Sequence, residues 1–284
     1  MSIEPTNLCG ELAAGEVVPG QVRIWWQGQL SYALRGSAGT VLIDPFLTPM
    51  ERRLVKPPFG VGDLVDLDAI LVTHEHSDHL DAPTVVAALE RFPDLRVIVP
   101  EPLADGLRTL TAHGGRIIGT QPGQTTDVGA LRVHAIPAFH GIDFSDAYSY
   151  GKELSGGLFR YLGYVVKLGG VTVLDTGDTL VTDEIIDAVR ALGLPIDVAL
   201  LPINGRDHFR EKRNLVGNMD HREAAMFASA VGAELLIPGH YDMFHDNRGF
   251  PGHLIDFVDR FHPDLHVAIL SKHRTFNHMR GGRP

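Results

Sequence analysis

The sequence has little cysteine and no long apolar run. Cys9 is the only cysteine in 284 residues, so no disulfide bond can form within the chain. No segment approaches the roughly 18 to 20 consecutive apolar residues that a membrane-spanning helix needs. The first 20 residues also lack the basic and apolar regions of a signal peptide. We therefore expect a cytoplasmic protein in a reducing compartment, without a membrane partner.

Positive charge is scarce as well. The chain has 25 Lys and Arg residues against 35 Asp and Glu residues, which gives a formal net charge of −10. Nucleic-acid binding depends on Lys and Arg side chains that neutralise phosphates, so we expect no nucleic-acid partner. The chain is 44% hydrophobic with a mean hydropathy of +0.02, which allows a large core. The sequence leaves homo-oligomerisation open.

Strand and helix signals occur in two similar series along the chain. In the first half, the sequence predicts one helix and seven strands: a helix over 82–91, with strands at 22–26, 31–36, 40–44, 68–73, 95–100, 116–118 and 131–137. In the second half, it predicts three helices and five strands: helices over 182–193, 220–232 and 252–261, with strands at 163–168, 171–178, 197–203, 234–240 and 265–270. Two such series predict a single α/β domain over 1–284, with two packed sheets and helices outside. Residues 1–20 form an N-terminal extension in this interpretation.

Several local signals sharpen this prediction. Gly169-Gly170 predicts a hairpin turn. Asp81 can cap the helix over 82–91, and Asp220 with Glu223 forms a capping box. Trp25 and Trp26 are consecutive in a strand, so one should face the core and the other should face outward or toward a helix.

Histidines and acidic residues crowd the stretch LVTHEHSDHLD, residues 71–81, directly after an apolar strand. A loop that follows a rigid strand can point several side chains at one place. We expect His74 and His76 to face one metal ion, and Asp78 and His79 to face a second ion close by. Imidazole and carboxylate ligands suit Zn²⁺, Mn²⁺ or Fe²⁺.

Further candidate ligands follow other predicted strands. They are His140 in PAFHG, Asp178 in LDTGDT and His240 in IPGHYD. Sites of α/β proteins usually lie where strands end, so these side chains can complete two neighbouring metal sites. A lone histidine at a strand end is usually structural, but the whole pattern favours a metal centre over that interpretation.

The order H-x-H-x-D-H, then His, then Asp in TGD, then His in PGH resembles the metallo-β-lactamase superfamily. The resemblance extends from IWWQG to PGHYDMF. It implies an αββα sandwich with a dinuclear metal site at one edge. It also implies a role for each candidate ligand: His74, His76 and His140 hold the first metal, Asp78, His79 and His240 hold the second, and Asp178 bridges them.

The same resemblance implies a supporting role for Asp44 in LIDPF. It matches an early aspartate of the superfamily that steadies the histidine loop without binding metal itself. On sequence grounds alone, a turn aspartate before Pro45 is an equally good interpretation.

Three flanking segments are similar to the L-ascorbate-6-phosphate lactonase family: VVPGQVRIWWQGQLSYALRGSAGTVLIDPF, IDVALLPINGR and AELLIPGHYDMF. This resemblance implies opening of the lactone ring of a phosphorylated sugar acid, with Mn²⁺ or Zn²⁺. DPFL and DHLD also resemble N-acylphosphatidylethanolamine-hydrolysing phospholipase D. Only 29 residues separate Asp44 from His74, fewer than the lactonases lead us to expect. The resemblance to the lactonases therefore predicts the reaction type of this protein better than its substrate.

In the expected reaction, a hydroxide that bridges two metal ions attacks the lactone carbonyl, and Asp78 or Asp178 moves the proton. The loop NGRDHFREKRN, residues 204–214, is the one basic cluster of the chain. We expect Arg206 to bind an anionic group of a small-molecule substrate, with Asn204 and Tyr241 beside it.

Two alternatives stay open around the expected site. The basic loop can equally be a solvated surface whose charges are balanced by Asp207 and Glu211. Residues 141–161, which directly follow His140, can be a lid over the substrate or an ordinary surface loop.

Other functions compete with a lactonase or related carboxylic-ester hydrolase. A metal-dependent phosphodiesterase, phospholipase D-like or nuclease-like, needs the same two metals and hydroxide. A di-iron redox protein is disfavoured because those relatives carry Glu where His76 stands. A sensor or scaffold without catalysis is disfavoured by the complete ligand set.

Overall fold

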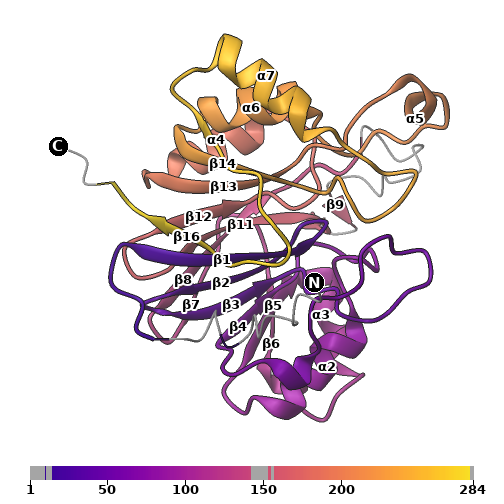
Figure 1. Ribbon diagram of the computed structural model, residues 1–284. Coiled ribbons are helices and arrows are strands. Elements are labelled where there is room, and N and C mark those ends of the chain that lie inside the picture. Colours follow the sequence, from indigo (N-terminus) through magenta and orange to yellow (C-terminus); the bar gives the residue numbers. More distant parts are fainter. Residues whose placement is uncertain (1–9, 11–14, 142–152, 155–156, 282–284) are drawn as a thin grey trace, which may run out of the picture.

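The computed structural model describes residues 10, 15–141, 153–154 and 157–281, and two sheets form its centre (Figure 1). Most of the proposed extension over 1–20, and residues 142–152 and 155–156 of the loop considered as a lid, lie outside the described residues. The first sheet has seven strands in the order β16-β1-β2-β3-β4-β5-β6. The second also has seven, in the order β15-β14-β13-β12-β11-β8-β7.

The strands fall where alternating or continuous apolar residues lie between turn residues. The first sheet contains β1 (Gln21–Gly28), β2 (Ser31–Gly36), β3 (Gly39–Ile43), β4 (Ala69–Leu71), β5 (Arg96–Pro100), β6 (Ile117–Thr120) and β16 (Phe276–Met279). The second contains β7 (Thr125–Val128), β8 (Leu131–Pro137), β11 (Leu162–Lys167), β12 (Thr172–Asp175), β13 (Ile196–Pro202), β14 (Ala233–Gly239) and β15 (His266–Val267). A small pair, β9 (Glu153–Leu154) and β10 (Leu158–Phe159), stands apart.

Helices cover the outer faces of both sheets. On the first sheet these are α2 (Ala82–Arg91) and α3 (Glu101–Arg108), and on the second α4 (Asp183–Ala191), α6 (His221–Ala230) and α7 (Pro251–Phe261). Within the described ranges, three short helices lie in loops: η1 (Val61–Asp63), η2 (Gly114–Arg116) and α5 (His208–Lys212). The predicted αββα sandwich is confirmed. In the described part of the chain, no helix is both long and apolar enough to cross a membrane.

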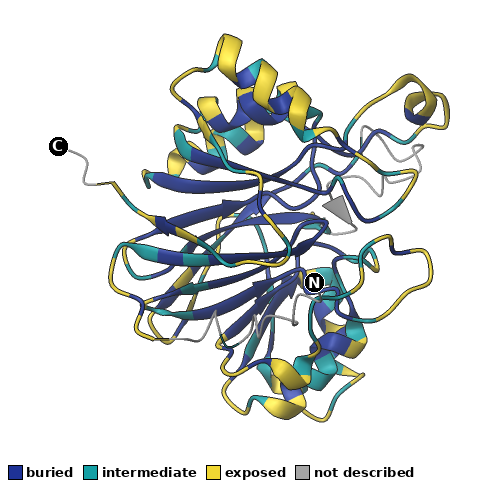
Figure 2. Cartoon of the chain, viewed as in Figure 1, coloured by how far each residue is buried: buried dark blue, intermediate teal, exposed yellow. Residues whose placement is uncertain are grey.

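Three apolar layers hold the sandwich together. One lies between the sheets, and one lies between each sheet and its helices. Figure 2 shows buried residues along both sheets and exposed residues on the outer sides of the helices. Trp26 faces the layer between the sheets, whereas Trp25 packs on Phe59 in the helix-covered layer. The predicted alternation of the two tryptophans is therefore confirmed.

The strand directions decide where the site can form. In the first sheet β3, β4, β5 and β6 are mutually parallel, and in the second β12, β13, β14 and β15 are parallel. The carboxyl ends of parallel strands meet at one edge of a sheet. The loops after β4, β12 and β14 therefore gather at a common edge of the sandwich.

Most predicted local signals are present. Gly169-Gly170 joins β11 to β12 as an antiparallel hairpin, and Asp220 with Glu223 forms the capping box of α6. The strand expected over 265–270 is shorter, because only His266–Val267 pairs with β14. α3, β7 and β16 were not predicted. α3 follows β5 without a break, and β16 has the mixed sequence FNHM, whose pairing with β1 is a tertiary contact.

The prediction that the Asp81 side chain caps α2 is wrong. Asp81 stands at the N-cap of α2, but its side chain accepts no capping hydrogen bond from the helix backbone. Its carboxylate accepts instead from the Leu47 and Thr48 backbone N–H groups at 3.0 and 2.8 Å. It also accepts from the Thr48 and Thr84 hydroxyls at 2.8 and 2.6 Å. Asp81 thus clamps the loop after β3 to the start of α2.

We predict that Asp81→Asn lowers the free energy of unfolding by about 1.5–3 kcal/mol, because an amide turns one of these acceptors into a donor that faces donors. Urea unfolding followed by circular dichroism measures the change. Thr182→Ala is the matched control: the Thr182 hydroxyl accepts from Ile185 N at the true cap of α4, and its loss should cost about 1 kcal/mol. A smaller loss for Asp81→Asn than for the control would contradict the clamp.

Candidate metal centre

Seven side chains from four strand-end loops meet at the edge of the sandwich. His74, His76, Asp78 and His79 lie in the loop that follows β4. The others follow β8, β12 and β14: His140, Asp178 and His240. The structure thus brings together all the residues proposed from the sequence as metal ligands.

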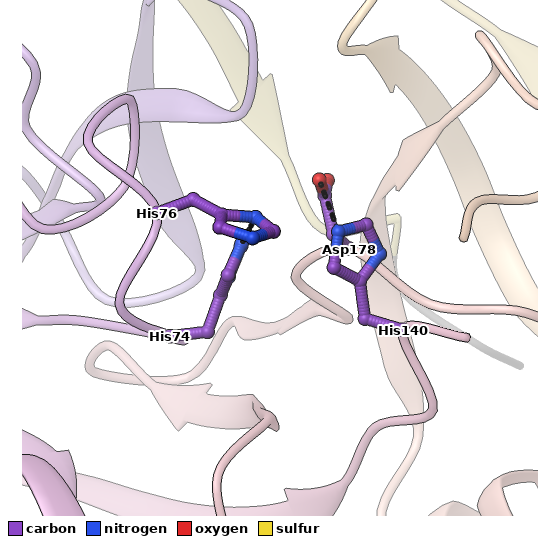
Figure 3. A group of neighbouring side chains, drawn as sticks. All are labelled: His74, His76, His140 and Asp178. Atoms are coloured by element: carbon purple, nitrogen blue, oxygen red, sulfur yellow. Dashed lines mark hydrogen bonds and ion pairs between the residues drawn. The ribbon is translucent and has the colours of Figure 1, made fainter. Parts of the chain in front are cut away.

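Four of these residues form a first group: His74, His76, His140 and Asp178 (Figure 3). Their possible ligand atoms all lie within 4.8 Å of one another. His74 Nε2 is 2.9 Å from His76 Nδ1, and His140 Nε2 is 3.6 Å from Asp178 Oδ2. This spacing allows the four side chains to share one ion.

Asp78, His79 and His240 form a second group, whose ligand atoms also lie within 4.8 Å of one another. Asp78 Oδ2 is 3.8 Å from His79 Nε2 and 3.7 Å from His240 Nε2. Asp178 Oδ2, from the first group, lies 3.5 Å from His79 Nε2 and 3.1 Å from His240 Nε2. One oxygen of Asp178 thus faces both groups.

Asp44 supports the centre from behind. Its backbone has a φ of +44°, and its two carboxylate oxygens accept from the Thr73 backbone N–H at 2.7 Å and the Thr73 hydroxyl at 2.6 Å. His79 Nδ1 is 2.6 Å from Asp44 Oδ2. Because Asp44 faces Nδ1, the other ring nitrogen of His79 is directed at the second group. Asp44 could also be grouped with His74 and His79 around an ion, but both its oxygens are already engaged.

The residues present fit a divalent transition metal. Imidazole nitrogens and carboxylate oxygens are its usual ligands. Asp178 is buried, and its Oδ1 has no hydrogen-bond partner in the described part of the chain. His140 Nδ1 donates to the Gly217 carbonyl at 2.7 Å, which leaves Nε2 to face Asp178. A carboxylate buried among imidazoles is expected where an ion compensates the cost of desolvation.

The pKa shifts favour, for most of these side chains, the deprotonated state in which they can bind a metal ion. Burial lowers the pKa of His74 well below its usual value, lowers the pKa of His76 to about 4, and lowers the pKa of His140. Those imidazoles are therefore neutral near pH 7. For Asp178, burial opposes ionisation, but His240, His79 and His140 outweigh it and hold the pKa well below its usual value. Burial also lowers the pKa of His79, but the carboxylates of Asp178 and Asp44 outweigh it and raise that pKa.

A pocket of about 380 Å³ opens onto both groups. Its lining includes five of the proposed ligands: His76, Asp78, His140, Asp178 and His240. The rest of the lining is mainly polar and cationic, with one further acid, Asp246, and two apolar residues, Leu215 and Phe244; the polar and cationic side chains include Arg52, Asn204, Arg206, Arg210, Arg213, Asn218 and Asn247. Tyr241, which we expected beside the substrate, is not among the described residues that line the pocket, and its ring packs on Trp26.

The basic cluster of 204–214 divides into two kinds of residue. Arg210 is buried and donates to the carbonyls of Asp246 and Arg248 at 3.2 and 3.1 Å, so it holds the loop in shape. Arg206 faces the pocket and pairs with Glu223 at 3.1 Å, and 38% of its side chain is exposed. Arg206 therefore remains a candidate for binding substrate.

Asn204 lies in a chain of amides that ends at His240. The Asn218 amide donates to Asn204 Oδ1 at 2.9 Å, and the Asn204 amide donates to Asn247 Oδ1. Asn247 Nδ2 is 3.4 Å from His240 Nδ1. Asn204 thus lines the pocket, as expected for a residue that binds substrate, and it also supports a candidate ligand.

Sequence reasoning missed several residues of the site, Asn218 and Asn247 of the pocket lining among them. Thr73 was passed over, although it directly precedes His74 at the end of a strand. Arg52 lines the pocket from the loop between β3 and η1, and nothing in the sequence links that loop to 204–214. Gln29 contacts Asp78 from the turn between β1 and β2. Its only signal was its place in WWQGQL.

We predict that Asp178→Ala releases bound metal, because its Oδ2 faces both groups. Metal retained after dialysis, measured by elemental analysis, should fall well below that of the unchanged protein. Asp175→Asn is the matched control. Asp175 is also a buried aspartate, it belongs to neither ligand group, and its Oδ1 accepts from the Gly177 N–H at 2.7 Å, a bond that an amide oxygen can also accept. If Asp178→Ala retained as much metal as the control, Asp178 would not be a ligand.

Comparisons with known proteins identify the family and the fold of this chain. The family model of the β-lactamase superfamily domain matches residues 39–241. The chain is 34% identical over 225 residues to a UPF0173 metal-dependent hydrolase of Archaeoglobus fulgidus, covering 78% of this chain and 84% of that protein. Among solved structures, Igni18, a metallo hydrolase from Ignicoccus hospitalis, aligns with a TM-score of 0.68 at 22% identity. That alignment covers 91% of this chain and 98% of Igni18.

A second solved structure, an isothiocyanate hydrolase from Delia radicum gut bacteria, aligns with a TM-score of 0.69 at 18% identity. It covers 91% of this chain and 100% of that protein. At these identities the solved structures establish the fold alone, whereas the family model and the archaeal relative establish the family. The chain belongs to the metallo-β-lactamase superfamily, in the family of the UPF0173 metal-dependent hydrolases.

Proposed function

We propose that this protein is a dinuclear metal-dependent hydrolase that opens the lactone ring of an anionic substrate, such as a sugar-acid or phosphorylated sugar-acid lactone. The observation that carries the proposal is the position of Asp178 Oδ2, which lies 3.6 Å from His140 Nε2 and 3.1 Å from His240 Nε2. A carboxylate so placed between two ligand groups can bridge two ions. The similarity of the flanking segments to the L-ascorbate-6-phosphate lactonases supports the lactone.

Two divalent ions held here, Zn²⁺ or Mn²⁺ with Fe²⁺ as a further candidate, would supply hydroxide near neutral pH and polarise the substrate carbonyl. His74, His76 and His140 would hold one ion, and Asp78, His79 and His240 the other, with Asp178 between them. We propose a cytoplasmic location and no nucleic-acid or membrane partner, on the basis of the single cysteine and the negative net charge.

Asp78 is the better of the two carboxylates for moving a proton. It lines the pocket with 17% of its side chain exposed, so it can reach both substrate and solvent. Asp178 is only 4% exposed at its side chain and is surrounded by three imidazoles. We assign Asp178 to holding the ions alone, and Asp78 both to holding the second ion and to accepting a proton and returning it to the departing alkoxide.

The exposed arginines that line the pocket support an anionic substrate. Arg52, Arg206 and Arg213 are exposed. All three line the same pocket as the carboxylates of Asp78 and Asp178. A phosphate or carboxylate can bind to these arginines while the ester carbonyl faces the proposed metal ligands.

A substrate screen tests the proposed reaction. Protein reconstituted with Mn²⁺ or Zn²⁺ should open anionic lactones, and release of acid, followed as a pH change, together with product detection measures the rate. Phosphodiesters should react far more slowly. Hydrolysis of phosphodiesters without lactone opening would contradict the proposal and favour the phospholipase D-like alternative.

We predict that Arg206→Ala raises KM for an anionic lactone about tenfold or more. A charge-assisted hydrogen bond contributes about 1.5–3 kcal/mol, and the pairing with Glu223 places the effect toward the lower end. KM for a neutral lactone should change little, and so should the metal content.

Arg222→Ala is the matched control for Arg206→Ala. Arg222 pairs with Asp220, the other acid of the same capping box, at 3.2 Å, but it does not line the pocket. Its removal should leave both KM values unchanged. Equal losses for anionic and neutral lactones in Arg206→Ala would show that the arginine only maintains the loop.

A further inference from the structure

Gln29 lies at the metal centre in an unusual backbone conformation. It forms the turn between β1 and β2 with a φ of +52°, which is uncommon for a residue with a side chain. Its N–H donates to Asp242 at 3.0 Å, and its carbonyl accepts from Trp26 Nε1 at 2.9 Å and from the His240 N–H at 2.8 Å. Three hydrogen bonds therefore hold this turn in place beside the loop that carries His240.

The turn directs the Gln29 carboxamide into the second group. The side-chain Nε2 lies 3.0 Å from Asp78 Oδ2 and 3.4 Å from His240 Nε2. Those two atoms are the ones through which Asp78 and His240 would hold an ion. Gln29 is fully buried, and its Oε1 has no hydrogen-bond partner in the part of the chain that the structure describes.

The two distances match the spacing of atoms that share one ion. Two ligand atoms that each lie about 2.1 Å from a metal are roughly 3.0 Å apart at a right angle and roughly 3.4 Å apart at a tetrahedral angle. The other pairs of possible ligand atoms in this group have similar separations. They range from 3.1 Å between His240 Nε2 and Asp178 Oδ2 to 3.8 Å between His79 Nε2 and Asp78 Oδ2. The end of the Gln29 side chain thus belongs to the same set of atoms.

The oxygen of the carboxamide can take that place. A half-turn of the amide exchanges Oε1 and Nε2 with little movement of other atoms, and the two orientations differ only in their partners. In the present orientation Nε2 donates to Asp78 and Oε1 is unpaired. In the other orientation Oε1 faces Asp78 Oδ2, which is also an acceptor, and His240 Nε2, so an ion between the three atoms would hold them together.

We propose that Gln29 is an additional ligand of the second metal ion through its side-chain oxygen. The proposal rests on the proposed function in one respect, namely that a second ion binds. Gln29 joins Asp78, His79, His240 and Asp178, so the protein alone supplies five ligand atoms to this ion. Five or more nitrogen and oxygen ligands, one of them a neutral carbonyl, suit Mn²⁺ better than the four-coordinate sites usual for structural Zn²⁺.

Two substitutions separate a ligand from a hydrogen-bond donor. Gln29→Met keeps the length of the side chain but removes the amide. Gln29→Glu keeps an oxygen and removes the N–H group. Gln27→Met is the matched control, because Gln27 is also a buried glutamine of the same hairpin and its Oε1 accepts from Ser31 at 2.8 Å, away from both groups.

The test is a calorimetric titration of metal-free protein with Mn²⁺, with thermal unfolding to check that each variant is folded. The unchanged protein and Gln27→Met should bind two equivalents. Gln29→Met should bind the first as before and the second at least about tenfold more weakly. Gln29→Glu should bind both equivalents as tightly as the unchanged protein or more tightly.

Each other outcome has one meaning. If the unchanged protein binds one equivalent, the dinuclear part of the proposed function fails, and this proposal fails with it. If it binds two and Gln29→Met binds both as tightly, the proposed function stands and Gln29 is no ligand. If Gln29→Glu is as weak as Gln29→Met, the amide acts as a donor to Asp78, and the proposal is overturned.

Discussion

One carboxylate oxygen, Asp178 Oδ2, is the point on which the arrangement of the centre depends. It lies 3.1–3.6 Å from the Nε2 atoms of three imidazoles: His79, His140 and His240. Burying such a charge is costly unless it is compensated on several sides. The three histidines follow β4, β8 and β14, so this compensation requires both sheets to end at the same edge. The packing of the two sheets is therefore the condition for the chemistry.

A single glycine lets Asp178 reach that position. Gly177 has a φ of +59°, and a Cβ there would lie 2.8 Å from Thr73 Cβ and 2.9 Å from the Leu162 carbonyl. The loop after β12 thus lies directly against the residue that precedes the histidine loop. Asp44 holds Thr73 from the other side through two hydrogen bonds. Close backbone packing at Gly177 and the buried carboxylate of Asp44 together fix the position of the loop after β12, which carries Asp178, relative to the histidine loop after β4.

Backbone strain is concentrated at the same edge. Four described residues other than glycine have a φ between +44° and +59°, and three of them are Gln29, Asp44 and His240. Such conformations cost free energy and persist only where surrounding contacts determine them. Hydrogen bonds from Thr73, Trp26 and the His240 backbone supply those contacts. The strained residues thus set the directions in which side chains enter the centre, and the cost is offset by the contacts that hold them.

The sequence by itself determined the sandwich and the identity of the seven proposed ligands. Spacing within 74–79 and positions at strand ends are local properties, so they can be recognised along the chain. Tertiary structure alone decided which polar residues support or face the centre. Gln29 forms a hydrogen bond with Asp78, which lies 49 positions away in the sequence. Arg52 and Arg206 come from distant loops and line the same pocket. Tyr241 follows His240 directly, yet its ring packs on Trp26, because a residue next to a ligand can face the core instead of the pocket. Local spacing identifies donor atoms, whereas the direction of a side chain depends on packing between segments that are distant in the sequence.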